Sequence, residues 1–154
     1  MDRDCETEIL LVEDNADDLE LTLHSLRANK VANKIDIVRD GEEALDFLFG
    51  RGRLSARSPV KLPSLVLLDL KLPKVDGLEV LREIRSHPAT RILPVVILTS
   101  SREEKDLVAG YQLGVNSYIQ KPVDFRAFRD TVKQLGLYWL LVNQPPPAIV
   151  QKYV

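Results

Sequence analysis

The side chains best suited to chemistry in this sequence each follow a short apolar run. They are two adjacent acids, a third acid, two hydroxyls and one amine, at Glu13, Asp14, Asp69, Thr99, Ser100 and Lys121. If the apolar runs are neighbouring parallel strands, their carboxyl ends meet at one edge of a sheet, where α/β folds bind ligands. The pattern predicts a carboxylate-rich site with a single ammonium beside it.

The carboxylates of such a site need compensation. Two unit charges about 4 Å apart repel by roughly 4 kcal/mol at an effective dielectric near 20. Lys121 offsets one of three negative charges, so a shared proton or a divalent cation must relieve the rest. An all-oxygen donor set suits Mg²⁺, which we favour. Two His and one Cys disfavour a nitrogen and sulfur metal site.

Each of these residues, taken alone, has a simpler explanation. An acid after a strand is often a helix N-cap, and Thr99 alone would be an ordinary hydroxyl at a strand end. Lys121 before Pro122 is common in turns that lead from a strand into a helix. It is the order and spacing of the four positions together that favours a site.

The elements that must position these residues alternate along the chain. Apolar runs predict five strands, at 9–12, 35–38, 65–68, 94–98 and 117–119. Amphipathic segments predict five helices, from Ala16 through Leu26, from Asp40 through Leu48, around 78–84, over 102–113 and from near Asp124. In the second helix, Asp40 and Glu43 read as a capping box. Runs without polar alternation are typical of strands buried on both faces, so we predict a doubly wound α/β sandwich with a parallel sheet.

Four segments resemble the receiver domain of two-component response regulators. They are Ile9-Leu10-Leu11-Val12-Glu13-Asp14-Asn15, Leu67-Leu68-Asp69-Leu70-Lys71-Leu72-Pro73 with Asp76-Gly77, Thr99-Ser100, and Lys121-Pro122. The resemblance covers about residues 8–140. It implies a (βα)5 sandwich with five parallel strands in the flavodoxin-like order 2-1-3-4-5.

The resemblance implies that Asp69 accepts a phosphoryl group from a histidine kinase. Asp14, Asp69 and the backbone carbonyl of Lys71 would bind Mg²⁺, with Glu13 acting through water. Such a chain is a phosphoacceptor rather than an enzyme, and assists only its own phosphorylation and dephosphorylation. Lys71 is neither acidic nor an amide, so slow dephosphorylation is expected, and Ser101 supports the same expectation.

Three further residues take their expected roles from the same resemblance. Lys121 would pair with the phosphoryl oxygens, and Thr99 would hydrogen-bond the phosphorylated aspartate. Tyr118 stands where the family has its rotating aromatic, so Thr99 and Tyr118 would form the switch.

The long connection at 50–63 and the ending from Leu137 to Pro147 resemble the small regulators paired with bacterial phytochrome kinases. A phytochrome-type photoreceptor kinase is therefore the expected partner. The expected division is a polar leader at 1–7, a receiver domain at 8–142 and a Pro-rich tail at 143–154, without a DNA-binding output domain. A net charge of −2 and the lack of an apolar run of about 20 residues favour a cytoplasmic protein without nucleic-acid or membrane partners.

The last helix carries an apolar stripe. It comprises Phe125, Phe128, Val132, Leu135, Trp139 and Val142. This stripe should face the core at its start, and Leu137, Tyr138, Leu140 and Leu141 add apolar surface on other sides. A helix that is apolar all round needs burial beyond its own domain, so we expect a homodimer through this helix and the tail.

Several alternatives stay open from the sequence. The chain could pass phosphate onward as a relay intermediate. A phosphatase with an Asp nucleophile would want a second acid where Lys71 stands, and a receiver that has lost phosphorylation would not keep all the acceptor residues. We interpret His24 and His87 as surface residues, Cys5 as a mobile thiol, and the basic 50–63 connection as a solvated loop rather than a docking site for anions.

Overall fold

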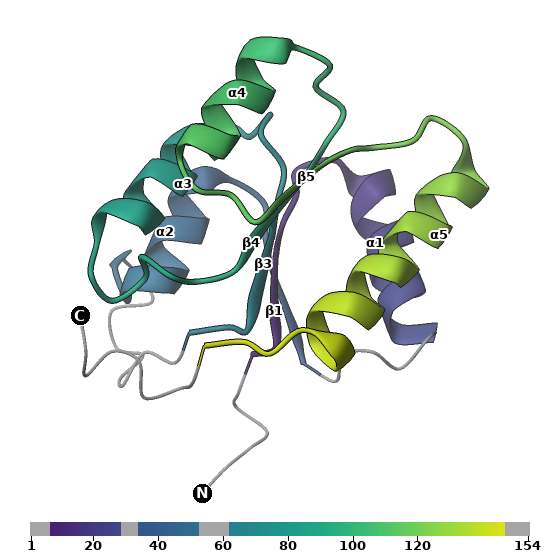
Figure 1. Cartoon of the computed structure of the whole chain (residues 1–154), viewed down its shortest axis with the longest axis horizontal. Helices are drawn as coiled ribbons and strands as arrows, with labels where there is room; N and C mark the ends of the chain where they lie inside the picture. The colour runs from purple at the N-terminus through teal and green to yellow at the C-terminus, as the bar shows by residue number, and fades with distance from the viewer. Residues whose placement is uncertain (1–6, 29–33, 53–61, 147–154) are drawn as a thin grey trace, which may run out of the picture.

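The computed structural model describes residues 7–28, 34–52 and 62–146. Its five parallel strands pair in the order β2-β1-β3-β4-β5 (Figure 1), which confirms the predicted fold. The strands are β1 (Ile9–Val12), β2 (Ile35–Val38), β3 (Leu65–Leu68), β4 (Val95–Thr99) and β5 (Ser117–Gln120). The helices are α1 (Ala16–Ala28), α2 (Gly41–Phe49), α3 (Gly77–Ser86), α4 (Glu104–Gln112), α5 (Phe125–Gly136) and the π-helix η3 (Leu137–Val142). The interpretations of Cys5, of most of the 50–63 connection and of the tail beyond residue 146 lie outside the described residues.

Helices cover the sheet in two layers. Figure 1 shows α1 and α5 on one face and α2, α3 and α4 on the other. Along β1, Leu10 and Val12 belong to the core cluster with α2 and α3, whereas Ile9 and Leu11 belong to the cluster with α1 and α5. Both clusters are closed to solvent, so the prediction of burial on two faces is confirmed for β1, β3 and β4.

The two edge strands differ from that prediction. Ile37 of β2 is 36% exposed, and β5 has no buried residue. An edge strand has a neighbour on one side only, so part of its surface remains open. The expectation of burial on both faces is therefore wrong for β2 and β5.

Aspartates begin three of the helices. The side chains of Asp40, Asp76 and Asp124 each accept a hydrogen bond from the backbone N–H three residues later. The predicted capping box is half formed, because the Glu43 carboxylate accepts from the backbone N–H of Arg39 instead of that of Asp40. These caps satisfy N–H groups that the first turn of a helix leaves free.

Gly77 lets α3 approach the loop that follows β3. A Cβ at Gly77 would lie 2.3 Å from the backbone oxygen of Asp69, so no other residue fits there. The backbone N–H of Gly77 donates to the carbonyl of Leu70 at 2.9 Å. The start of α3 therefore fixes the backbone on which Asp69 stands.

The last helix does not continue regularly to Val142. The α-helix ends at Gly136 and the chain winds on as η3, where the N–H of Asn143 bonds to the carbonyl of Tyr138 at 2.7 Å. A π-turn holds more residues than an α-turn, so the predicted stripe loses its register. Both ends of the stripe are exposed, Phe125 by 61% and Val142 by 65%. The expectation that the stripe faces the core at its start is wrong at Phe125.

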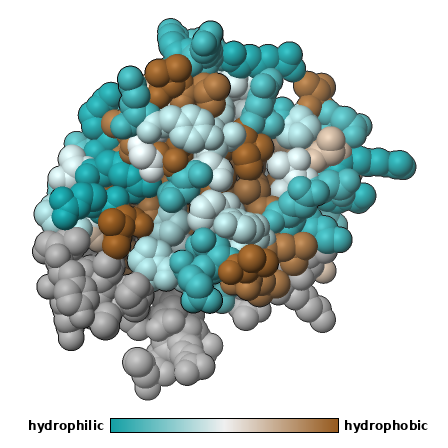
Figure 2. All heavy atoms as spheres, in the orientation of Figure 1, coloured by the Kyte–Doolittle hydropathy of each residue, from teal (hydrophilic) through white to brown (hydrophobic). Residues whose placement is uncertain are grey.

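The outer surface is mainly hydrophilic, with separate hydrophobic patches on the face that Figure 2 shows. In the part of the chain that the structure describes, no helix is both long enough and apolar enough to pass through a bilayer.

Candidate functional site

The predicted site residues lie at the carboxyl edge of the sheet because the strand register places them there. The backbone N–H of Asp69 donates to the carbonyl of Val12 at 3.1 Å, which sets the start of the β3 loop beside Glu13. The backbone N–H of Lys121 donates to the carbonyl of Thr99 at 2.7 Å. The pairing of neighbouring strands thus positions Asp69 and Lys121 at this edge.

Lys121 is the centre of the cluster. Its Nζ donates to Glu13 Oε1 at 2.6 Å, to Asp18 Oδ2 at 2.8 Å and to Asp69 Oδ2 at 2.9 Å. Its side chain is 5% exposed, and burial alone would lower its pKa. The hydrogen bonds that Lys121 donates to Asp18 and Glu13, together with the charge of Asp69, outweigh burial and raise the pKa of Lys121. The ammonium therefore stays charged at any physiological pH.

Asp18 was not among the predicted site residues. It lies in the first turn of α1, and its side chain is 30% exposed. In the sequence it reads as an acid that favours a helix N-terminus. The signal that could have found it is its position one helical turn after Asp14, which turns it back toward the strand end.

Asp69 is buried and ionised. Its Oδ1 accepts from the Thr99 hydroxyl at 2.8 Å and from the backbone N–H of Lys71 at 3.2 Å. Burial would raise the pKa of Asp69, but the charge and hydrogen bond of Lys121 hold that pKa below its usual value. A carboxylate that is ionised and fixed in place can act as an oxygen nucleophile.

Glu13 carries the excess negative charge of the cluster. It is 3% exposed, and its Oε2 accepts from the backbone N–H of Asn15 at 3.1 Å. Burial, together with the nearby charge of Asp69, raises the pKa of Glu13 to about 7. One ammonium thus compensates three carboxylates only in part, but these are Glu13, Asp18 and Asp69, with Asp18 in the place that the sequence analysis gave to Asp14.

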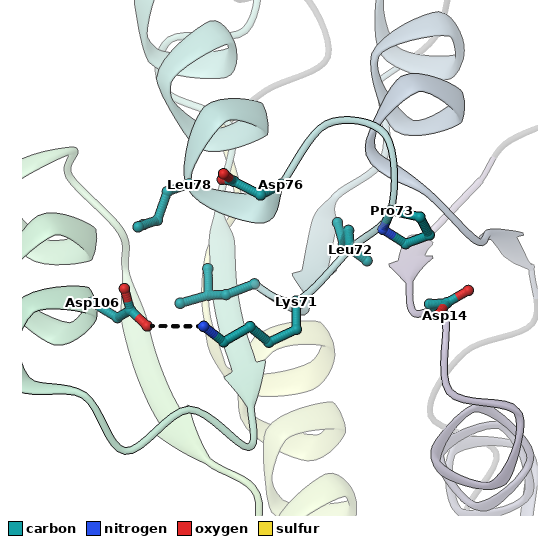
Figure 3. A pocket seen from close by; sticks show the side chains of 8 residues that line it. Asp14, Lys71, Leu72, Pro73, Asp76, Leu78 and Asp106 are labelled. Atoms are coloured by element: carbon teal, nitrogen blue, oxygen red, sulfur yellow. Dashed lines mark ion pairs between the residues drawn. The ribbon is translucent and has the colours of Figure 1, made fainter.

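Asp14 lies to one side of this cluster, at an open pocket. The pocket has a volume of about 410 Å³ and is lined by Asp14, Leu70, Lys71, Leu72, Pro73, Asp76, Leu78 and Asp106. Figure 3 shows Asp14 at one end of it and the ion pair of Lys71 with Asp106 at the other. Ser100 is exposed, so of the two predicted hydroxyls only that of Thr99 contacts Asp69.

The donor set at this edge fits a hard cation. The described residues contain no group of three His, Cys, Asp or Glu side chains gathered to hold a metal. Lys121 bonds both Glu13 and Asp69 in this structure. Mg²⁺ needs only one or two carboxylates and completes its shell with water. The raised pKa of Glu13 also marks a region where added positive charge is favourable.

Tyr118 of β5 points its hydroxyl inward. This oxygen is buried, and it has no hydrogen-bond partner among the described residues. Burial raises the pKa of Tyr118. The Ser101 hydroxyl, which is near this oxygen but not in hydrogen-bonding geometry, opposes the rise, and the charges of Asp106 and Asp69 add to it. The tyrosine hydroxyl therefore stays protonated, and it costs free energy in its present place.

Two residues that the sequence analysis placed at the surface are confirmed there. His24 lies beside a groove of about 880 Å³ between α1 and the start of α5. His87 caps the end of α3, and its Nδ1 bonds the backbone carbonyl of Glu83 at 2.8 Å. Neither is part of the cluster around Lys121.

Comparison with known proteins gives a consistent result. A family model described as the response regulator receiver domain matches residues 9–133. A probable methanogenesis regulatory protein, FilR2 of Methanothrix harundinacea, is 43% identical over 90% of this chain and 86% of its own length. The response regulator Rcp1 of Synechocystis is 41% identical over 91% of this chain and 93% of its own length.

Solved structures agree with these relatives. The Mn²⁺-bound form of Rcp1 superimposes with a TM-score of 0.84 over 90% of this chain and 98% of its own, at 40% identity. The bacteriophytochrome response regulator AtBRR is 52% identical and superimposes with a TM-score of 0.70 over 90% of this chain and 99% of its own.

Proposed function

The chain belongs to the response regulator receiver family of two-component signalling, and we propose that it accepts a phosphoryl group on Asp69 from a histidine kinase. The observation that carries this proposal is the state of Asp69, a buried and ionised carboxylate at a strand end with Lys121 at 2.9 Å. Phosphoryl transfer needs positioning and charge neutralisation more than covalent help from the protein. The edge of this sheet offers both.

In the proposed reaction, a carboxylate oxygen of Asp69 attacks the phosphorus of the donor. The bond between phosphorus and the histidine nitrogen of the kinase breaks, and the nitrogen keeps the electron pair. The product is an acyl phosphate on Asp69. Lys121 and the Thr99 hydroxyl already contact this carboxylate, so they are in place to bond the new phosphoryl oxygens.

Mg²⁺ is the proposed cofactor. Asp14, Asp69 and the backbone carbonyl of Lys71 would hold it, with Glu13 acting through water. When bound, the ion supplies positive charge that neutralises the transferring phosphoryl group. The solved Mn²⁺ form of the relative Rcp1 supports a divalent ion in this family.

The proposed switch consists of Thr99 and Tyr118. Thr99 is fully buried, and its hydroxyl bonds Asp69 before any phosphoryl group is present. Phosphorylation would therefore exchange the acceptor of this hydroxyl. The buried, unpartnered hydroxyl of Tyr118 lies close enough for the charge of Asp69 to affect its pKa, so a change of charge there alters its surroundings.

A phytochrome-type kinase is the proposed partner, in the cytoplasm. The support is the name of AtBRR, a bacteriophytochrome response regulator at 52% identity. FilR2, at 43% identity, is named for methanogenesis instead. The relatives thus agree on the family and differ in their pathways, and the subfamily features at 50–63 and 137–147 favour the phytochrome branch. The division into a leader at 1–7, a receiver at 8–142 and a tail at 143–154 belongs to the same proposal.

A homodimer through the C-terminal helix completes the proposed function. Tyr138, Leu141 and Val142 expose 50%, 66% and 65% of their surfaces in the single chain. Leu141→Glu combined with Val142→Glu should convert the dimer to a monomer in analytical ultracentrifugation. Val123→Glu, which changes an 87% exposed apolar side chain elsewhere, is the matched control. Monomeric behaviour of the unmodified chain at micromolar concentration would contradict this part of the proposal.

The phosphoacceptor role is tested by labelling with a small phosphodonor in the presence of Mg²⁺. The full chain should take up one phosphoryl group, and Asp69→Asn should take up none. Asp17→Asn, in an exposed position of α1, is the matched control and should label normally. Labelling that persists in Asp69→Asn would overturn the assignment.

A further inference from the structure

Asp106 is a buried carboxylate that the proposed phosphoacceptor role does not use. It lies in the first turn of α4 and is 8% exposed. Its Oδ2 accepts from the Ser101 hydroxyl at 2.5 Å, and the Nζ of Lys71 lies 3.7 Å from the same oxygen. A buried carboxylate is costly without partners. One oxygen atom thus joins α4 to the loops that follow β3 and β4.

Both partners of Asp106 are connected to the phosphoacceptor, Lys71 directly and Ser101 through Thr99. The backbone N–H of Lys71 donates to Asp69 Oδ1 at 3.2 Å, while its side chain crosses the pocket to Asp106 (Figure 3). The Thr99 hydroxyl donates to the same Oδ1 at 2.8 Å. The backbone N–H of Ser101 in turn donates to the Thr99 oxygen at 3.3 Å. Two short paths therefore lead from Asp69 to Asp106.

Lys71 and Ser101 differ in how easily their contacts with Asp106 can break. The Lys71 side chain is 60% exposed, and ion pairs of such side chains contribute little to stability. The Ser101 hydroxyl is buried and bonds Asp106 at short distance. Asp69 is two residues from Lys71 in the chain. A phosphoryl dianion on Asp69 would offer Lys71 a more highly charged acceptor than Asp106 does. Lys71 is the contact that phosphorylation can break.

The placement of α4 depends on the bonds that Ser101 makes with Asp106 and with the start of the helix. The backbone N–H of Glu103 donates to the Ser101 oxygen at 3.3 Å, so Ser101 orders the entry to the helix. Farther along α4, a Cβ at Gly110 would lie 3.3 Å from Cδ2 of Tyr118. The helix therefore rests closely against the tyrosine ring, and a shift of α4 changes the space that Tyr118 occupies.

We propose that Asp106 is a positioning residue that competes with the phosphoryl group on Asp69 for Lys71, and so couples phosphorylation to the placement of α4. In the unmodified chain, Asp106 holds Lys71. In the phosphorylated chain, Lys71 turns to the phosphoryl oxygens and Asp106 keeps Ser101 alone. This inference rests on the proposed phosphoacceptor role of Asp69, and it adds a residue on α4 to that role.

The test is a double-mutant cycle on the affinity of the full chain for beryllofluoride, a phosphoryl analogue, with Mg²⁺. Asp106→Asn keeps an oxygen acceptor for Ser101 but removes the charge that holds Lys71. It should raise the affinity about two- to fivefold, the range of a partly exposed ion pair. In a Lys71→Met background, the same substitution should leave the affinity unchanged.

A spectroscopic readout separates competition from a general loss of structure. Backbone amide shifts of α4 in Asp106→Asn, without beryllofluoride, should move toward those of the unmodified chain with beryllofluoride bound. Glu103→Gln is the matched control, because it removes one negative charge beside α4 whose partner is Lys105. It should leave the affinity unchanged, and its effect on amide shifts should be confined to the residues next to position 103 rather than follow the beryllofluoride pattern along α4.

The outcomes distinguish this inference from the proposed function. An equal effect of Asp106→Asn with and without Lys71, or an equal effect of Glu103→Gln, would overturn the role of Asp106 while the phosphoacceptor stands. An unmodified chain that takes up neither a phosphoryl group nor beryllofluoride would overturn both.

Discussion

The carboxyl edge of the sheet buries charged side chains, whereas the segment after α5 exposes apolar ones. At the edge, Lys121 has three carboxylate partners within 2.9 Å and is shielded from solvent. In η3 no residue is buried, and Leu141 leaves 66% of its surface open. The edge is therefore complete within one chain, whereas η3 presents apolar surface that the chain itself does not cover. The first region suits the proposed phosphoryl transfer, and the second suits contact with another molecule.

The sharpest test of the carboxyl edge removes the buried ammonium of Lys121. Lys121→Met should lower the free energy of unfolding by about 3–5 kcal/mol, because it leaves buried carboxylates without a counter-charge. Denaturation in urea would measure the loss. Added Mg²⁺ should restore part of the stability, since a cation can replace the missing charge. A loss below about 1 kcal/mol would show that the edge tolerates unpaired carboxylates.

The exposure of η3 can be tested by shortening one leucine in η3 and one in the buried face of α5, which precedes it. Leu135→Ala should cost about 2–5 kcal/mol, because this side chain is 7% exposed and its loss leaves a cavity. Leu141→Ala should change monomer stability by less than about 0.5 kcal/mol, as for other surface positions. Thermal or chemical unfolding at concentrations where the chain is monomeric checks both. Equal costs would mean that Leu141 is as well packed in the single chain as Leu135.

The charge excess at the edge predicts a pH dependence. Because the pKa of Glu13 is raised from 4.5 to about 7 on folding, the folded chain holds that proton more tightly than the unfolded chain. The stability from this group is therefore present below about pH 4.5 and lost as the pH rises through 7, by up to about 3 kcal/mol.

Unfolding of the unmodified chain and of Glu13→Gln across this pH range measures that effect. The stability advantage of the unmodified chain over the variant should shrink as the pH rises. An advantage that grows instead would mean that Lys121 outweighs burial at Glu13.

The smallest expected effect concerns Asp18, the partly exposed partner of Lys121. Asp18→Asn keeps an oxygen acceptor but loses a charge, so stability should fall by about 1 kcal/mol. Labelling of Asp69 by an anionic phosphodonor should become faster, because one repelling charge is gone. Asp17→Asn, next to it but without this contact, should change neither measurement. Slower labelling of Asp18→Asn would show that the hydrogen bond from Lys121 to Asp18 matters more for labelling than the repulsion between Asp18 and the phosphodonor.

Much of the fold could be predicted because it depends on local pattern. The apolar runs at 9–12, 35–38 and 65–68 coincide with β1, β2 and β3. Buried parallel strands read as continuous apolar runs, and three aspartates mark helix starts by their own hydrogen bonds. The parallel sheet then placed Glu13 and Asp69 together without further information.

What the sequence did not predict depends on contacts distant in the chain. Asp18 is 103 residues from Lys121, so no local pattern relates the two. The π-turn after Gly136 was not predicted either, because the spacing of the apolar residues from Leu135 to Val142 fits a regular α-helix. The contact of Asp18 with Lys121 is set by the fold rather than by a local pattern.

The three bonds of Lys121 have a consequence for any anion that enters this edge. An ammonium has three N–H donors, and here Glu13, Asp18 and Asp69 take one each. All three N–H donors of Lys121 are in use. An anion can therefore bind Lys121 only by displacing one of the carboxylate oxygens. Such a centre therefore selects anions by their ability to displace a carboxylate. It ignores weak anions such as chloride and responds to an incoming group only when that group is a stronger acceptor than the carboxylate it displaces.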